Sequence, residues 1–260
     1  MKSIELRTNP VSGEDDTFKR WGIKYSSAGQ VNIIATDIAA WLVKYPFGVK
    51  EKPKVFFARG HAVEHGCQRI HDGDEFDDPE QEALDMFNKQ TAFMFDEAKK
   101  KEQDLIVPMI QQYRELLGDD IQEIECSQQK IEVEVEGLGI PIIGYTDFTF
   151  ADKIVDIKTT GRMPSAISPA HRRQGAIYQK ASGNKSMEFV YLTGKRSERY
   201  VLDNWQDDWD EVVGRLFQFK EMLSRFENKE ELAKVVQPDY SNFYWSSAEM
   251  RDAGRKIFGY

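Results

Sequence analysis

The sequence predicts one α/β domain with a central mixed β-sheet flanked by helices. Three observations lead to this fold class. Amphipathic helical segments fill the first half of the chain, strand-like segments follow one another between residues 121 and 160, and a helix with two further strands comes next. This order differs from a repeated strand–helix–strand array. A length of 260 residues suits one larger α/β domain or two small ones, and we treat residues 1–260 as one domain.

The composition excludes some classes of protein. Hydrophobic residues make up 40% and charged residues 30% of the chain, which allows a packed core. The net charge of −9 argues against a protein that coats nucleic acid through bulk charge, but it allows a locally basic groove. No apolar run approaches the roughly 20 residues that cross a bilayer, and the polar N-terminus lacks a signal core. We expect a cytoplasmic protein that does not contact a membrane.

An irregular N-terminal arm of residues 1–30 is expected to precede a helical part of residues 31–118. The first predicted helix has Thr36 or Asp37 as its N-cap. It ends at the helix-breaking pair within residues 46–48.

Three further helices are expected, over residues 58–71, 80–101 and 105–117. In the first of them, Val63, Cys67 and Ile70 follow the i, i+4, i+7 spacing of a buried stripe. The acidic stretch 71–80 does not match the spacing of a calcium-binding EF-hand, so we expect a solvated loop. Gly118 follows the last helix at the usual position of a helix end.

The sheet is expected within residues 119–203, where strands are predicted over residues 121–127, 130–137, 140–150, 153–160, 187–193 and 197–202. In the second strand, Ile131, Val133 and Val135 alternate with glutamates, so one face should be buried and the other solvated. A helix over 169–181 separates the fourth strand from the fifth. Residues 204–260 are expected to form a long helix and an aromatic tail.

Two carboxylates and an ammonium are expected to converge in this sheet. Asp156 and Lys158 are two residues apart on one strand and therefore share a face. Asp147 lies on the preceding strand, across a short hairpin. Adjacent carboxylates are best tolerated when a cation shares the site, and oxygen ligands select Mg²⁺ or Mn²⁺. Such a group suits hydrolysis of phosphodiesters, although a surface salt bridge between Asp156 and Lys158 alone would give the same triplet.

Four motifs in order resemble the PD-(D/E)XK nuclease superfamily, specifically its RecB-like, phage-type exonuclease branch. The family pattern is a helix with Gly, Ala-Val and an acidic residue or His, then G-x-x-D, D-x-K-T and Q-x-x-x-Y. In this chain the corresponding segments are Gly60–Glu64, Gly144–Asp147, Asp156–Thr159 and Gln174–Tyr178.

The resemblance implies a restriction-endonuclease-like core and a metal-dependent deoxyribonuclease. Glu64, Asp147, Asp156 and the backbone carbonyl of Ile157 would hold one or two Mg²⁺ or Mn²⁺ ions, and Lys158 would be catalytic. Stand-alone relatives imply an exonuclease that acts on DNA ends or single strands in recombination, repair or phage DNA metabolism. The location would be the cytoplasm of a bacterial cell or of a phage-infected host.

The resemblance also bears on partners and cofactors. Family members with an iron–sulfur cluster use four cysteines, whereas this chain has two, so no cluster is expected. The chain has no Walker loop. It would therefore act alone or with a separate recombinase, helicase or single-strand-binding protein.

Residues around the last motif are expected to contact DNA. Gln174 and Tyr178 share a helix face. The resemblance implies that they contact the DNA backbone or support the site. Three arginines are candidates for phosphate clamps, although ordinary surface charge would explain each of them equally well: Arg162, Arg172 and Arg173. Aromatic residues of the tail could stack on bases, although packing as a lid is the simpler expectation: Phe243, Tyr244 and Trp245.

Two alternative functions are compatible with parts of the sequence. His61, Glu64 and His65 spell H-x-x-E-H, the zinc signature of inverted zinc peptidases. That function needs a third, acidic ligand such as Glu80 or Glu82, and it leaves the later motifs unexplained. The other alternative is a non-catalytic DNA-end-binding protein of the same fold, against which the intact acidic and lysine residues argue.

Overall fold

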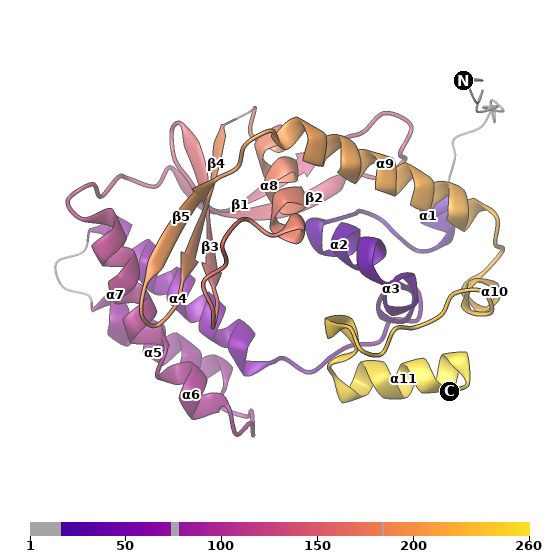
Figure 1. The fold of residues 1–260 in the computed structure, drawn as a ribbon, viewed down its shortest axis with the longest axis horizontal. Helices are drawn as coiled ribbons and strands as arrows, with labels where there is room; N and C mark the ends of the chain where they lie inside the picture. Colours follow the sequence, from indigo (N-terminus) through magenta and orange to yellow (C-terminus); the bar gives the residue numbers. More distant parts are fainter. Residues whose placement is uncertain (1–16, 74–77, 184) are drawn as a thin grey trace.

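A five-stranded mixed sheet lies at the centre of the computed structural model, which describes residues 17–73, 78–183 and 185–260 (Figure 1). The strands, in sheet order, are β1 (Cys126–Val133), β2 (Ile142–Thr149), β3 (Lys153–Thr159), β4 (Ser186–Leu192) and β5 (Ser197–Val201). Neighbouring strands are antiparallel except for β3 and β4, which are parallel. The helix between β3 and β4 makes the crossover that a parallel pair requires. The predicted α/β class with a mixed, helix-flanked sheet is confirmed.

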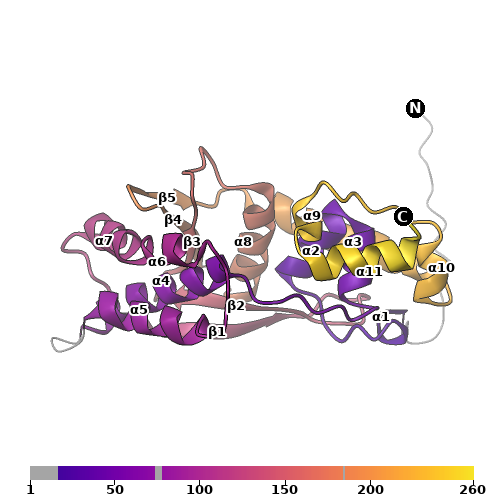
Figure 2. The same cartoon turned by 90° about the horizontal axis from the view of Figure 1, so that it is seen from below.

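Two hydrophobic cores cover the two faces of the sheet. Helices α8 (Pro169–Ala181) and α9 (Trp205–Ser224) contribute to one core, and α4 (Val55–Asp72), α5 (Pro79–Gln90) and α7 (Ile106–Leu117) to the other. Within β3, Ile154 belongs to the first core and Val155 to the second, because successive side chains of a strand point to opposite faces. Seen from below, α4 to α7 lie at the opposite end of the molecule from α10 and α11 (Figure 2).

The N-terminal region differs from the prediction. Residues 1–16 of the predicted arm lie outside the described residues, but residues 17–30 include helix α1 (Thr17–Arg20) and the start of α2 (Ala28–Thr36). Phe18 of α1 and Val31 of α2 are buried, and this burial stabilises helical structure that a local pattern did not reveal. The predicted cap at Asp37 is confirmed, because its Oδ1 accepts a hydrogen bond of 2.9 Å from the amide of Ala40 in α3 (Ile38–Lys44).

The predicted long helix over residues 80–101 is wrong. Helix α5 ends at Gln90, and a short helix, α6 (Lys99–Gln103), follows a non-helical segment. Thr91 is the C-cap of α5, and its amide and hydroxyl both donate to the carbonyl of Phe87. The ammonium of Lys99 donates to the carbonyl of Thr91, where a continued helix would have a backbone amide. The phenyl rings of Phe93 and Phe95 are exposed in this segment. The predicted loop before α5 lies partly outside the described residues, at 74–77.

The first two predicted strands form one strand. Residues 121–125 lie outside the sheet, and β1 ends at Val133 because its partner β2 begins at Ile142, the residue opposite. Within β1, Gln128 adopts a positive φ of 50°, an unusual conformation for a residue with a side chain. The other strands and α8 form close to their predicted ranges.

The tail packs onto the body of the protein. It contains α10 (Lys229–Ala233), the 3₁₀ turn η1 (Phe243–Trp245) and α11 (Ala248–Phe258). Trp245 is fully buried, and its indole N–H donates a 2.7 Å hydrogen bond to the carboxylate of Asp37. Phe243, by contrast, is 61% exposed. Across the described part of the chain, no helix combines the length and hydrophobicity that crossing a bilayer needs.

Candidate active site

The candidate site forms where β2 and β3 separate. The two strands pair only at Phe148–Val155 and Thr149–Ile154. Beyond that point the Oδ2 atom of Asp147 accepts a 2.8 Å hydrogen bond from the amide of Ile157. A side-chain carboxylate thus satisfies a backbone donor near the point where the ladder stops. The bond also brings Asp147 to the strand that carries Asp156, as the hairpin predicts.

Asp156 is the most enclosed acidic residue of the site. Its side chain is 1% exposed, and its Oδ2 atom pairs with the ammonium of Lys158. Its Oδ1 atom accepts a 3.0 Å hydrogen bond from Gln174 on α8, and the same amide nitrogen lies 2.9 Å from the hydroxyl of Tyr178. A buried carboxylate requires such partners. Gln174 therefore contacts Asp156 directly, and Tyr178 contacts Gln174. Support of the site is one of the two roles that the resemblance implies for them.

Gly144 of the G-x-x-D motif is required by the ring of Tyr178. A Cβ atom at residue 144 would lie 2.7 Å from Cε1 of Tyr178 and 3.3 Å from the side chain of Ile131. Both neighbours are buried, so neither side chain can move away freely. The glycine therefore lets α8 approach the sheet closely enough for Gln174 to reach Asp156.

Gly144→Ala is expected to lower the free energy of unfolding by about 1–3 kcal/mol, because it overpacks a buried contact. Gly214→Ala is the matched control, since a Cβ atom at this position in α9 would meet nothing within 4 Å. In a helix interior that exchange should stabilise by about 0.5–1 kcal/mol. Urea unfolding of both variants measures the difference. An unchanged free energy of unfolding in Gly144→Ala would show that the ring of Tyr178 does not require a glycine at residue 144.

Glu64 reaches the site from α4. It lies on the solvent-facing stripe of that helix, and its carboxylate accepts a hydrogen bond from the side-chain amide of Gln128 on β1. Glu64 and Asp147 both line a groove of about 450 Å³ between α4, α5 and β1. Sequence reasoning missed Gln128. Its only sequence signal is a polar residue near the start of a predicted strand.

Arg59 holds α4 against the end of β3. Its guanidinium is buried, pairs with Glu102 of α6, and donates to the carbonyl and hydroxyl of Thr159. Thr159 directly follows Lys158 in the chain. This contact positions the helix that carries Glu64 relative to the strand that carries the lysine.

The three acidic residues form an electrostatically strained group. Burial raises the pKa of Asp147 well above its ordinary value, and the charges of Asp156 and Glu64 raise it further. Burial also raises the pKa of Asp156, opposed by Lys158. For Glu64, burial and the charge of Asp156 raise the pKa, opposed by the hydrogen bond from Gln128. One ammonium therefore balances only part of the negative charge.

Lys158 remains protonated in this setting. Burial disfavours its charged form, but Asp156 and Asp147 outweigh that effect and raise its pKa. A lysine whose pKa is raised is a poor general base at neutral pH. Its ammonium instead supplies positive charge to the site.

The donor set fits a hard divalent cation in its chemistry. The residues in question are carboxylates with an excess of negative charge, which suits Mg²⁺ or Mn²⁺ better than a soft metal. Within residues 17–73, 78–183 and 185–260, however, no three histidine, cysteine or acidic side chains are already arranged to hold a metal ion. In this structure Asp147 and Asp156 engage the amide of Ile157 and the ammonium of Lys158. The predicted ligands are thus brought together without forming a complete coordination shell.

Both acidic residues proposed as the third zinc ligand pair with arginines. His65 lies 3.2 Å from the carboxylate of Glu82, which also pairs with Arg69. Glu80, the other proposed third ligand, pairs with Arg114. His61 lines the same groove as Glu64.

Two of the three predicted arginine clamps have structural partners. Arg172 binds the carboxylates of Asp203 and Asp208 at the start of α9. Arg173 is buried, with its guanidinium bonded to Asn32 and Glu211. Both guanidinium groups therefore fasten α8 to its neighbours, and their expected contact with phosphate stays a prediction.

Arg162 is exposed in the loop after β3, where its backbone bonds to the hydroxyl of Thr160. Its expected contact with phosphate stays a prediction.

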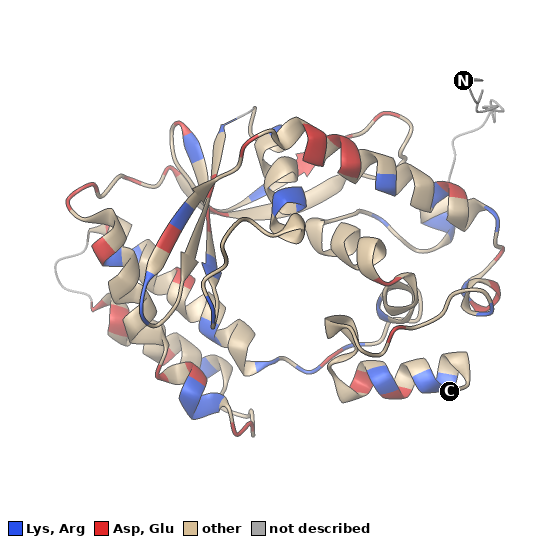
Figure 3. Ribbon diagram, viewed as in Figure 1, with Lys and Arg blue, Asp and Glu red and all other residues tan. Residues whose placement is uncertain are grey.

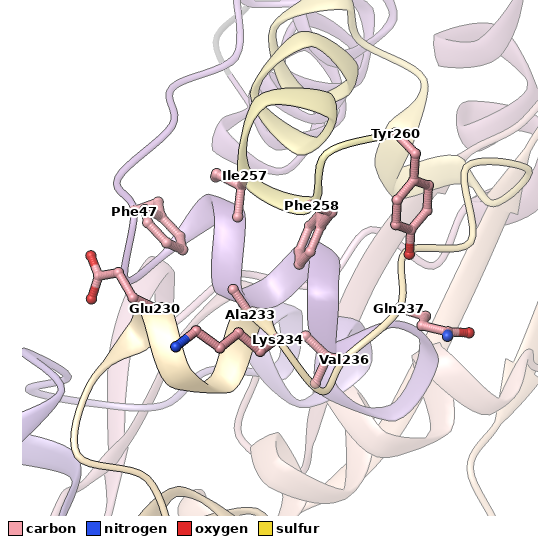
Figure 4. Close-up of a pocket in the computed structure, with 9 residues that line it drawn as sticks. All are labelled: Phe47, Glu230, Ala233, Lys234, Val236, Gln237, Ile257, Phe258 and Tyr260. Atoms are coloured by element: carbon pink, nitrogen blue, oxygen red, sulfur yellow. The ribbon is translucent and has the colours of Figure 1, made fainter.

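A second pocket, of about 470 Å³, lies away from the acidic residues. It is lined by the end of α3, by α10 and by the last residues of α11, including Phe47, Lys234 and Tyr260 (Figure 4). None of the predicted site residues lines it. The candidate chemistry thus belongs to the groove beside β2 and not to this pocket.

Comparisons with known proteins agree with the fold. No family model matches the chain, and no curated protein matches it. A crystal structure of a "putative exonuclease" from Eubacterium rectale superposes with a TM-score of 0.50 at 16% identity, covering 85% of this chain and 88% of that chain. The protein SSO0001 gives a TM-score of 0.34 at 17% identity, covering 70% of this chain and 93% of that chain. The chain therefore shares the α/β fold of the Eubacterium rectale protein.

Proposed function

We propose that this protein is a Mg²⁺- or Mn²⁺-dependent DNA nuclease. The observation that carries the proposal is the meeting of Glu64, Asp147, Asp156 and Lys158 where β2 and β3 separate. Excess negative charge in a partly enclosed groove favours a divalent cation, and the adjacent ammonium suits an anionic substrate.

Each residue has a distinct part in this proposal. Glu64, Asp147, Asp156 and the Ile157 carbonyl would hold the metal, which lowers the pKa of bound water and stabilises charge on a phosphoryl oxygen when present. Lys158 supplies positive charge to the phosphate in the transition state. Gln174 holds Asp156 in place through its 3.0 Å hydrogen bond and is a positioning residue.

We further infer exonuclease action on DNA ends or single strands, in recombination, repair or phage DNA metabolism. The motif order at residues 60–178 favours this mode, as does the exonuclease name of the Eubacterium rectale protein of the same fold. A separate recombinase, helicase or single-strand-binding protein would then supply or receive the processed DNA.

Digestion of end-labelled linear and circular DNAs, single- and double-stranded, tests this function. With Mg²⁺ or Mn²⁺ we expect linear DNA to be degraded and circles to resist, and a chelator should abolish cleavage. Cleavage of circles would show endonuclease action. Binding to ends with no cleavage under any of these conditions would favour the non-catalytic alternative.

The zinc peptidase alternative makes His61 and His65 of α4 the metal ligands, whereas the nuclease function gives that role to Glu64. Glu64→Gln is expected to slow DNA cleavage by about 10²-fold or more, whereas His61→Ala and His65→Ala should change it less than about tenfold. DNA cleavage rates and the zinc content of the purified protein measure this ranking. Stoichiometric zinc that both histidine variants lose would support the peptidase instead.

A further inference from the structure

Another groove, of about 610 Å³ and distinct from the two cavities described above, runs beside the N-terminal end of α4. We call it the lysine–aromatic groove and define it by Lys44, Lys50, Lys52, Lys54, Phe57 and Phe243. Its walls come from the segment that joins α3 to α4 and from η1 of the tail (Figure 1). Residues far apart in the sequence thus form one surface.

The groove is locally basic in an acidic protein. Its lining contains four lysines and one acidic residue, Glu51, whereas the whole chain has a net charge of −9. Glu51 lies 2.9 Å from Lys44 and 3.9 Å from Lys54, and Glu249, outside the lining, lies 3.7 Å from Lys52, so the lysines exceed the acidic groups that face them by two. Lys50 and Lys52 are exposed, and Figure 3 shows basic residues along this connecting segment. A local concentration of cations on such a chain attracts polyanions to this place rather than to the surface in general.

Aromatic rings form a row beside the same groove, whose lining includes Phe57, Phe243 and Tyr244 but not Phe56. The ring centroids of Phe57 and Phe56 lie 4.4 Å apart, those of Phe56 and Phe243 6.4 Å, and those of Phe243 and Tyr244 6.1 Å. Phe57 is 52% and Phe243 61% exposed, so water reaches large parts of both rings. The ammonium of Lys54 lies over the ring of Phe243, 5.1 Å from its centroid.

One face of α4 connects this groove with the acidic site. Phe57, His61 and Glu64 lie on the solvent-facing stripe of the helix, and His61 and Glu64 line the groove that Asp147 also lines. Glu64 comes seven positions after Phe57 in the helix, which is about 10 Å along the axis. A strand of about three stacked nucleotides spans that distance.

We propose that the lysine–aromatic groove binds single-stranded DNA and leads it along α4 to the acidic site. The inference rests on the nuclease function proposed above and names its substrate as an unpaired strand. Exposed rings stack on unpaired bases without regard to sequence, and lysines pair with the phosphates between them. In a duplex the bases are already stacked on one another, so the aromatic row can form far fewer stacking contacts with a duplex.

The test is fluorescence anisotropy with a labelled oligothymidine of about 15 nucleotides, in chelator so that no cleavage occurs. The double variant Phe57→Ala/Phe243→Ala should bind at least about tenfold more weakly, and Phe57→Trp should retain affinity. Lys50→Ala/Lys52→Ala should reduce the slope of log affinity against log salt by about 1.4, since each single-strand phosphate contact contributes about 0.7. The wild type should bind a duplex of equal length at least about tenfold more weakly than the single strand.

Tyr260→Ala and Lys256→Ala are the matched controls, because both side chains are exposed on the tail and neither lines this groove. Both should bind like the wild type, and thermal unfolding checks that every variant is folded. Undiminished binding by the folded aromatic variant, an equal loss in the controls, or tighter binding of duplex would overturn the inference. If the wild type cleaves DNA in that case, the proposed nuclease function still stands. Strand binding through the groove without any cleavage would contradict only the nuclease function.

Discussion

Lys158→Ala is expected to lower the rate of DNA cleavage by about 10²- to 10³-fold, the usual effect of removing one preorganised charge from a transition state. The ammonium pairs with Asp156. Its charge opposes the rise in pKa that burial causes at both Asp147 and Asp156. Its raised pKa keeps it charged at neutral pH. Single-turnover cleavage of a labelled linear DNA measures the effect directly.

Lys153→Ala is the control for this change. Lys153 lies on the same strand, at the end away from the site, where its ammonium is 3.8 Å from Glu188 and rests over the ring of Phe150. Its loss should change cleavage less than about threefold, because its ammonium faces Glu188 and Phe150 and not the acidic group of the site. Equal losses in the two variants would mean that charge on β3, and not Lys158 in particular, matters. Retained cleavage by a folded Lys158→Ala protein would rule out the proposed role of the lysine.

Asp147→Asn is expected to slow cleavage by at least about 10²-fold while making the metal-free protein more stable at neutral pH. The asparagine oxygen can still accept the hydrogen bond from the amide of Ile157. The substitution therefore removes charge while it keeps the shape. Function and stability oppose each other here because the carboxylate stands among like charges.

The sign of the stability effect follows from the pKa. Burial and two neighbouring carboxylates raise the pKa of Asp147 in the folded state above its ordinary value of 3.8. Protonated Asp147 thus contributes stability that is fully present below pH 3.8 and is lost as pH rises through the folded pKa. Asparagine does not titrate. The gain in unfolding free energy should be largest above the folded pKa and should disappear in acid.

Urea unfolding in chelator at neutral and acid pH measures this difference. Asp203→Asn provides a control of opposite sign, because Arg172 lowers the pKa of exposed Asp203. The ionised carboxylate of Asp203 stabilises the folded protein above its ordinary pKa, so Asp203→Asn should not raise the free energy of unfolding at neutral pH. A destabilised Asp147→Asn protein at neutral pH would show that the acidic group is not strained without metal.

Local patterns predicted the elements that their own residues determine. The range 169–181 is that of α8, because Ser168 caps the helix, Pro169 starts it, and Gln174 and Tyr178 fall one turn apart. The spacing of Asp156 and Lys158 likewise placed both on one face of a strand. The predicted helix over 80–101 failed, since Thr91 and its contacts with Phe87 and Lys99 interrupt a pattern that otherwise continues.

Partners distant in the sequence hold the guanidinium groups of Arg172 and Arg173. Arg172 and Arg173 appear in the sequence as a basic pair beside a nuclease-like motif. Their partners Asp203, Asp208 and Glu211 lie 31 to 38 residues further along the chain, on or just before α9. No local pattern indicates that α9 packs against α8 and covers these two guanidinium groups.

The sequence by itself determined the chemistry of the candidate site: Asp147, Asp156 and Lys158 are brought together by one hairpin and by the alternation of a strand, both of which are local geometry. Only the tertiary structure decided which residues from other parts of the chain lie beside this group. Glu64 meets Gln128 across 64 residues, and Phe57 meets the tail through Phe56 and Phe243. These contacts depend on how helices pack on the two faces of the sheet, which the burial of side chains from the whole chain determines.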